Sequence, residues 1–475
     1  MKGAAWRPVL PQQAGARLFA GGTLDIGSFL SMSTTQTLFT RRRFIQGAAA
    51  SAVIAGGGYY VLRPEEPKSD AKANVLIVGG GAAGISIASR LRRALPNAQI
   101  TIVDPAAEHY YQPGFTLVAG GVISPDEIVR QQSSLIPDGV RWVRDAVTTL
   151  DPDGKRVETA AHGSMRYDFL VLCPGLQMNF EAIEGLRREE LGRGNVHCIY
   201  DYASAQKCWT AIQRLAEKGG RAYFTDTWTK LKCGGAPKKI NMMAEDYCRR
   251  KGVRDRVDIQ LFTAAGNMFD VPLFAKRLEQ IYAERAIPVT MHYRVKQVDV
   301  SARRVTFENR SGSTPQTVTR DFDFLHVVPP MSAPDFVKAS PVSIDPATGR
   351  QGDWVPTHPA TLRHRRYPEM FVAGDVAGIP TSKTAAAIRM QAPVAAANLV
   401  AAIDGRTLPA RYDGYTACPF VTEYGKVLMA EFDYKKKPTP TLPLLDPGRE
   451  HRAGWILKRY VLKPMYFDLM LRGRA

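Results

Sequence analysis

The chain has 475 residues, 45% of them hydrophobic, which is enough for two or three domains with large apolar cores. Lys and Arg outnumber Asp and Glu by 63 to 45, and the net charge of +18 favours an anionic substrate or an anionic membrane surface as partner. The sequence shows no helix-turn-helix, no zinc-ligand spacing and no CxxC pair, which argues against nucleic-acid binding and against a metal site.

Residues 1–72 are predicted to be a leader followed by a linker. Arg41, Arg42 and Arg43 precede a weakly apolar segment, 47–62, and this order resembles a twin-arginine export signal. It predicts a peripheral location on the periplasmic side of the membrane, with the leader either cleaved or retained as an anchor. The alternative is a chance basic cluster before an Ala- and Gly-rich stretch.

The segment 75–84, Val-Leu-Ile-Val-Gly-Gly-Gly-Ala-Ala-Gly, predicts a strand, a tight turn and the start of a helix. Gly79 permits the turn, Gly81 lets a pyrophosphate approach the backbone, and Gly84 allows the helix to pack closely on the strand. Asp104 ends the next predicted strand, where a carboxylate would accept hydrogen bonds from a ribose hydroxyl. The pattern indicates a dinucleotide site.

The rest of the first unit holds two further candidate elements. An aromatic loop at 109–116 would lie over the cofactor, or else pack on itself as a surface loop. A strand predicted at 140–147 would bring the backbone of Val147 beside the adenine. The buried strand 167–175 ends in a turn of small residues, with Cys173 as a core residue.

A second α/β unit follows, and it lacks a second glycine fingerprint. After the predicted strand 221–225, Lys-Cys-Gly-Gly-Ala-Pro at 232–237 stands where a phosphate turn would be, which argues against a nicotinamide cofactor. Cys233 lies where a helix begins, and a helix N-terminus with nearby lysines favours the thiolate form.

The chain then returns to the first unit. The strand 367–375 ends in Asp375, which is placed to bind the ribityl or phosphate part of a flavin dinucleotide. Lys383 precedes an alanine-rich helix, 385–402, whose N-terminus would stabilise negative charge on the reduced flavin ring.

The C-terminal part carries another loop cysteine, Cys418, and a basic, aromatic tail, 449–475. We expect Pro464 to split the tail into two short amphipathic pieces that lie in a membrane interface. A dimer or core contact is the alternative. Of the six cysteines, Cys233 and Cys418 are the pair that we expect to form a disulfide in an exported protein, and Cys198 is a third candidate.

These motifs resemble the sulfide:quinone oxidoreductase family, in its mitochondrial-type branch, from about residue 74 to residue 473. The most specific segments are His-Tyr-Tyr-Gln-Pro at 109–113, Lys-Cys-Gly-Gly-Ala-Pro at 232–237, Pro-Thr-Ser-Lys-Thr at 380–384 and Ala-Cys-Pro at 417–419. The resemblance implies a redox-active disulfide between Cys233 and Cys418 beside FAD. It also implies that FAD is surrounded by Gly79, Gly81, Ala82, Ala83, Gly84, Asp104, Gln112, Val147, Asp375 and Lys383.

The predicted architecture is an α/β fold with two Rossmann-like dinucleotide-binding domains, the second degenerate, and a C-terminal amphipathic membrane-associated region. The predicted parts are 1–72 as leader and linker, 73–200 and 331–411 as the FAD-binding domain, 201–330 as the second Rossmann-like domain, and 412–475 as the redox-cysteine loop with membrane-associated segments.

The predicted partners are sulfide, a membrane quinone, a small nucleophilic sulfane acceptor and the membrane surface. By this resemblance hydrosulfide attacks Cys418, which becomes a persulfide, and the Cys233 thiolate passes two electrons to the flavin. The alternatives are a flavocytochrome-type sulfide dehydrogenase with a haem partner, and a non-catalytic flavin-binding or sulfur-carrier protein. Whether the chain forms a homo-oligomer stays open.

Overall fold

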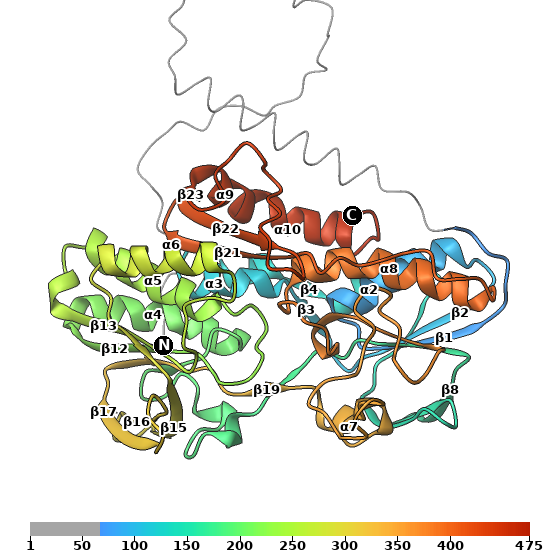
Figure 1. Cartoon of the computed structure of the whole chain (residues 1–475), viewed down its shortest axis with the longest axis horizontal. Helices are drawn as coiled ribbons and strands as arrows, with labels where there is room; N and C mark the ends of the chain where they lie inside the picture. The colour runs from blue at the N-terminus through green and yellow to red at the C-terminus, as the bar shows by residue number, and fades with distance from the viewer. Residues whose placement is uncertain (1–66) are drawn as a thin grey trace, which may run out of the picture.

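The chain builds two five-stranded parallel sheets, and the computed structural model describes residues 67–475 (Figure 1). The first sheet has the order β20-β9-β1-β2-β5. Its strands are β1 (Asn74–Val78), β2 (Gln99–Val103), β5 (Arg141–Val143), β9 (Phe169–Leu172) and β20 (Met370–Val372). Helices α2 (Ala82–Ala94) and α8 (Ala385–Ile403) pack side by side over this sheet (Figure 1).

The second sheet has the order β11-β18-β12-β13-β14 and is also parallel. Its strands are β11 (Val196–His197), β12 (Gly220–Thr225), β13 (Val257–Thr263), β14 (Val289–Met291) and β18 (Phe324–His326). The helices of this unit are α4 (Tyr202–Lys218), α5 (Ala236–Arg250) and α6 (Pro272–Glu284), and α3 (Phe115–Ala119) packs against α4 and α5.

Small antiparallel sheets complete the fold. The three-stranded ones are β6 (Val147–Asp151), β7 (Arg156–Thr159) and β8 (Gly163–Arg166); β15 (Tyr293–Asp299), β16 (Arg304–Asn309) and β17 (Gln316–Asp321); and β21 (Thr416–Glu423), β22 (Lys426–Phe432) and β23 (Glu450–His451). The pairs are β3 (Glu108–Tyr110) with β4 (Val129–Gln131), and β10 (Gln177–Met178) with β19 (Met331–Ser332), and a short helix, α7 (Asp335–Lys338), follows β19.

The predicted α/β class with two Rossmann-like units is confirmed. Strand β20 joins the first sheet beside β9, so the chain does return to its first unit. One local prediction differs from the structure: the strand expected at 140–147 is only β5, because Val147 already starts a different sheet. The proposed domain boundaries stay a prediction.

The C-terminal segment, residues 452–470, is one helical run rather than two pieces split at Pro464. It contains α9 (Arg452–Ile456), a π-helical stretch, α10 (Leu462–Pro464) and a second π-helical stretch. The π-helical stretch before Pro464 includes Tyr460, whose carbonyl the proline ring would contact in a regular α-helix, and the wider turn relieves that clash. Tyr466 and Phe467 are buried, whereas Ile456 is 46% and Tyr460 61% exposed, so the two halves have different surroundings.

One helix of the described residues is long and apolar enough to cross a membrane. This helix is α8, and 61% of its most apolar window is buried inside the protein. Because α8 packs against α2, its apolar composition is that expected of a helix in the core of a protein.

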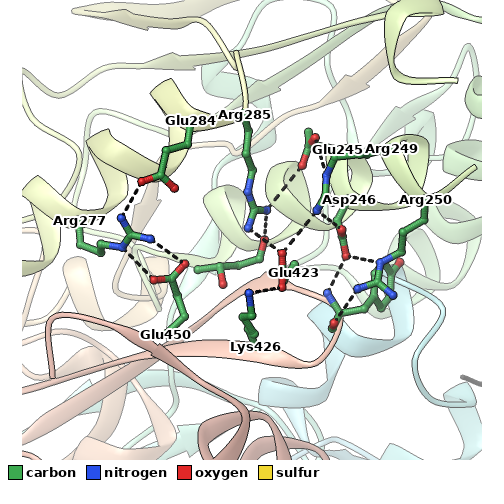
Figure 2. Close-up of polar contacts among 12 residues, drawn as sticks. Glu245, Asp246, Arg249, Arg250, Arg277, Glu284, Arg285, Glu423, Lys426 and Glu450 are labelled. Carbon is green, nitrogen blue, oxygen red and sulfur yellow. Dashed lines mark hydrogen bonds and ion pairs between the residues drawn. The ribbon is translucent and has the colours of Figure 1, made fainter. Parts of the chain in front are cut away.

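An ion-pair network fixes the far end of α5 to α6 and to the turn between β21 and β22 (Figure 2). Glu245 on α5 is buried and its carboxylate lies 3.5 Å from the guanidinium of Arg285, which follows α6. Arg285 also pairs with Glu423 at the end of β21, at 3.3 Å. Asp246 accepts a hydrogen bond from the backbone N–H of Tyr424 at 2.8 Å. The helix and the hairpin are therefore held in register at this end.

This network predicts a contrast between two glutamates on its opposite sides. Glu245→Gln removes one of the two carboxylates that pair with Arg285, whose side chain is 11% exposed, and we expect the free energy of unfolding to fall by about 2 kcal/mol. Glu284→Gln removes a pair whose carboxylate is 59% exposed, so its effect should stay below about 1 kcal/mol. Urea unfolding of both variants measures the difference, and equal stabilities would contradict the role of Glu245.

Candidate active site

The glycine turn after β1 has the shape that its sequence predicts. Gly79 has a φ of +104°, and a Cβ there would come within 2.4 Å of the carbonyl oxygen of Cys173. A Cβ on Gly84 would lie 1.9 Å from the oxygen of Gly79, so only glycine lets α2 pack this closely. A Cβ on Gly81 would meet nothing within 4 Å. The backbone is therefore open on the side where a phosphate would approach.

The start of α2 is suited to an anion. Gly81 is the N-cap and makes no side-chain capping bond, and Ala82 and Ala83 form the first turn. The N–H groups of that turn have no intrahelical acceptor, and they attract a phosphate through hydrogen bonding and the helix dipole. These residues fit a dinucleotide pyrophosphate.

Asp104 holds the same turn in place. Its carboxylate accepts hydrogen bonds from the backbone N–H of Gly80 at 2.6 Å and of Ala106 at 2.8 Å. Burial raises the pKa of Asp104, and these two bonds oppose that rise. Each carboxylate oxygen has a second lone pair, so the predicted bond from a ribose hydroxyl is compatible with this geometry and stays a prediction.

Asp375 and Lys383 lie together beyond β20. The Nζ of Lys383 donates to the backbone oxygens of Asp375 at 2.5 Å and Ala377 at 3.0 Å, and lies 3.8 Å from the ring centroid of Trp354. Burial lowers the pKa of Lys383 to about 7, although the Asp375 charge opposes this. Lys383 is thus a buried amine that can gain or lose a proton near neutral pH, and its position beside the flavin stays a prediction.

Gln112 is joined to the cysteine segment through Lys232. The Nζ of Lys232 donates to Oε1 of Gln112 at 2.9 Å, and Lys232 pairs with Lys383 in a short parallel bridge. The structure therefore brings Gln112, Lys383 and the residue before Cys233 into one region. Val147 lies in a different sheet, as the first residue of β6, and its predicted contact with the adenine stays untested.

Cys233 and Cys418 meet although 185 positions separate them. Their sulfur atoms are 3.5 Å apart. Cys233 lies just before α5 in a left-handed conformation, with a φ of +78°, while Cys418 is fully buried on β21. A Cβ on Gly235 would lie 2.6 Å from the Cys418 sulfur, so a glycine at 235 is required for this contact.

The two thiols differ in acidity. A hydrogen bond from Cys418 lowers the pKa of Cys233 well below its usual range, with help from the charge of Lys239 and against the effect of burial. The Nζ of Lys239 is 3.2 Å from the Cys233 sulfur. The same thiol–thiol bond and burial raise the pKa of Cys418. The pair therefore consists of a thiolate at Cys233 and a thiol at Cys418.

Sequence reasoning missed two neighbours of this pair. Lys458, from the C-terminal segment, is buried, and burial together with Lys239 lowers its pKa to about 7. Tyr200 donates from its hydroxyl to the backbone oxygen of Cys233 at 3.1 Å. In the sequence, the one indication that Lys458 is buried is its position within the apolar stretch 455–462. Cys198 is buried, and burial raises its pKa to about 12.

The turn after β12 explains why the second unit carries no dinucleotide fingerprint. Asp226 follows the strand directly, is buried, and accepts hydrogen bonds from Lys238 at 3.1 Å and from the Thr263 hydroxyl at 2.7 Å. This carboxylate uses its hydrogen-bonding capacity within the protein, on Lys238, Thr263 and the backbone N–H of Ala264. The second sheet thus positions Cys233 where a Rossmann unit would bind phosphate.

Comparisons with known proteins identify relatives over most of the chain. A family model described as pyridine nucleotide-disulphide oxidoreductase matches residues 73–220. The mitochondrial sulfide:quinone oxidoreductase of Dictyostelium discoideum is 38% identical over 86% of this chain and 88% of the relative. That of Mus musculus is 37% identical over 84% and 86%. The solved sulfide:quinone oxidoreductase of Aquifex aeolicus shares the fold, with a TM-score of 0.67 at 21% identity, covering 83% of this chain and 92% of that chain.

The predicted location on the periplasmic side of a membrane is wrong. The relatives from Dictyostelium discoideum and Mus musculus are named as mitochondrial proteins, which contradicts a twin-arginine export route. An Arg-rich segment poor in acidic residues is also typical of mitochondrial targeting segments, so the arginines at 41–43 do not discriminate between the two. They lie outside the described residues.

The contact between Lys239 and Cys233 predicts a change in thiol reactivity. Lys239→Met removes a charge that lowers the pKa of Cys233, so alkylation of the reduced protein by iodoacetamide at mildly acidic pH should slow several-fold. Mass spectrometry locates the alkylated cysteine. Lys251→Met, at the exposed far end of the same helix, is the control. An unchanged pH profile in the Lys239 variant would refute the assigned thiolate.

Proposed function

The chain belongs to the sulfide:quinone oxidoreductase family, and from that premise we propose that Cys233 and Cys418 are its redox pair. The enzyme oxidises sulfide and reduces quinone, and FAD is the cofactor of the family. The observation that supports the redox pair is the 3.5 Å separation of the two sulfurs beside Lys239.

The reaction begins from a disulfide between the two cysteines. Hydrosulfide attacks the sulfur of Cys418, the S–S bond breaks, and Cys418 becomes a persulfide while Cys233 leaves as a thiolate. The direction follows from acidity, because the thiol with the lower pKa is the better leaving group. The Lys239 ammonium stabilises the thiolate that is released.

FAD, when bound, supplies the acceptor for the two electrons of the thiolate and returns them to quinone. A small nucleophile removes the outer sulfur from Cys418 and leaves it as a thiolate. The two thiolates then close the disulfide, and the two electrons that this S–S bond formation releases are those that FAD would accept. Lys458 has a pKa of about 7 and can take up or release a proton at its Nζ near neutral pH. Gly79, Gly81, Asp104, Asp375 and Lys383 would hold the cofactor.

Cys233→Ser and Cys418→Ser test the redox pair. Both variants should remain yellow and folded, because neither residue is needed for the dinucleotide turn, but sulfide-dependent quinone reduction should fall to background. Cys208→Ala, on α4, is the control with normal activity. The measurement is anaerobic titration with sulfide, followed by absorbance of the flavin, and then addition of a quinone analogue. Full activity of either serine variant would refute the proposal.

We further propose that the C-terminal segment 452–470 rests on a membrane surface, from which the quinone enters. Its first half exposes Ile456 and Tyr460 beside basic residues, as interfacial helices do. The apolar contact is small, so binding should be peripheral and salt-dependent.

Ile456→Glu with Tyr460→Glu should reduce cosedimentation with anionic lipid vesicles severalfold, because two charges replace apolar surface. The control, Gln316→Glu with Thr317→Glu, adds the same charge on β17, which lies on the opposite side of the molecule from α9 (Figure 1). Equal loss of binding in both double variants would show that the effect is electrostatic alone.

A further inference from the structure

A buried chain of hydrogen bonds connects the C-terminal segment to the glycine turn. The hydroxyl of Tyr466 lies 2.7 Å from Nε2 of His109 on β3, and Nδ1 of His109 lies 3.1 Å from Oε1 of Gln132 after β4. Nε2 of Gln132 donates to the backbone oxygen of Gly80 at 2.8 Å. All three side chains are at most 5% exposed. His109 of the aromatic loop is thus linked to the glycine turn through Gln132 and to the C-terminal segment through Tyr466, and whether the loop lies over the cofactor stays a prediction.

The donor and acceptor atoms of the three side chains determine in which direction these hydrogen bonds run. The amide nitrogen of Gln132 donates to Gly80, so its oxygen is the acceptor for His109. Nδ1 of His109 therefore carries the proton, and Nε2 accepts from Tyr466. A neutral imidazole is required, and burial lowers the pKa of His109 to about 4. Each member donates toward the turn, and such chains strengthen cooperatively.

The last hydrogen bond of this series, from Gln132 to Gly80, lies where it can affect the binding of a phosphate. The carbonyl that accepts from Gln132 belongs to the peptide unit whose N–H is that of Gly81, the N-cap of α2. A Cβ on Gly80 would lie 2.3 Å from Nε2 of Gln132, so the side chain rests directly against the turn. Fixing that peptide orients the N–H groups that face the pyrophosphate.

The C-terminal segment also contacts the helix that follows the turn. The hydroxyl of Ser89 on α2 donates to the backbone oxygen of Leu471 at 2.6 Å, and Arg93 donates to that of Gly473 at 2.6 Å. The guanidinium of Arg130, on β4, lies 4.8 Å from the ring centroid of Phe467. The turn and its helix are therefore both held by residues 466–473.

We propose that Tyr466 is a positioning residue for FAD, acting through His109 and Gln132 on the peptide between Gly80 and Gly81. Docking of residues 466–473 and binding of FAD are then coupled: each stabilises the other by the same factor. This coupling rests on the FAD site and not on the proposed thiol chemistry, so the two stand or fall by separate measurements.

Tyr466→Phe tests the coupling, because it keeps the buried ring and removes the donor. FAD should dissociate at least about fivefold faster from this variant than from the wild type, measured as fluorescence of the released flavin. Tyr223→Phe, on β12 and with a ring as buried as that of Tyr466, should release FAD at the wild-type rate. Equal release rates in all three proteins would overturn the proposal.

A second measurement needs no variant. Hydrogen exchange of the amides of residues 466–473 should be slower in the FAD-loaded full chain than in the chain after FAD removal, while exchange in β15–β17 should not change. Exchange at 466–473 that does not respond to FAD would also overturn the proposal, because reciprocal coupling would then be absent. Neither readout involves sulfide or turnover, so a failure here would leave the proposed thiol chemistry untouched.

Discussion

The contact between the half-buried Cys233 sulfur and the buried Cys418 sulfur is the constraint on which the other features of the site depend. It requires a glycine at 235, because any side chain there would occupy the position of the Cys418 sulfur. It also requires β21 to lie along α5 in one register, and the ion pairs of Glu245 and Asp246 fix that register at the far end of the helix (Figure 2). A shift of one residue on β21 would turn Cys418 to the other face of the strand.

Bringing a thiolate into a buried site requires compensating positive charge. Lys239 supplies it by direct contact, and its pKa is about 12 because the two cysteines raise it more than burial lowers it. Lys458 lies near the same charges but has a pKa of about 7. The difference follows from distance to the sulfur: one lysine is paired, whereas the other experiences burial and the repulsion of its neighbour. The two lysines therefore suit different tasks, one holding charge and one exchanging a proton.

The sequence was sufficient for features that depend on local sterics. The turn at Gly79, Gly81 and Gly84 is a property of backbone conformation and close packing, so its pattern carries over directly. The second unit could likewise be recognised as degenerate, because the GxGxxG spacing of glycines is absent from its turn. Lys458 and the partners of His109 could not be predicted, since 357 positions separate His109 from Tyr466 and the contact depends on how the C-terminal run folds back. The expected break at Pro464 failed because π-helical turns accommodate the proline.

The two Rossmann-like units use one piece of geometry for different chemistry. In each, a parallel strand leads through a turn to a helix whose N-terminus carries partial positive charge. In the first unit the turn is open at Gly81, and that charge faces a phosphate. In the second, Asp226 directly follows β12 and is bonded to Thr263 on the neighbouring strand, and the helix begins three residues after Cys233. A helix N-terminus that would otherwise attract a phosphate is thus placed to stabilise a thiolate. The loss of the second nucleotide site and the gain of a reactive cysteine follow from the same replacement of the glycine turn.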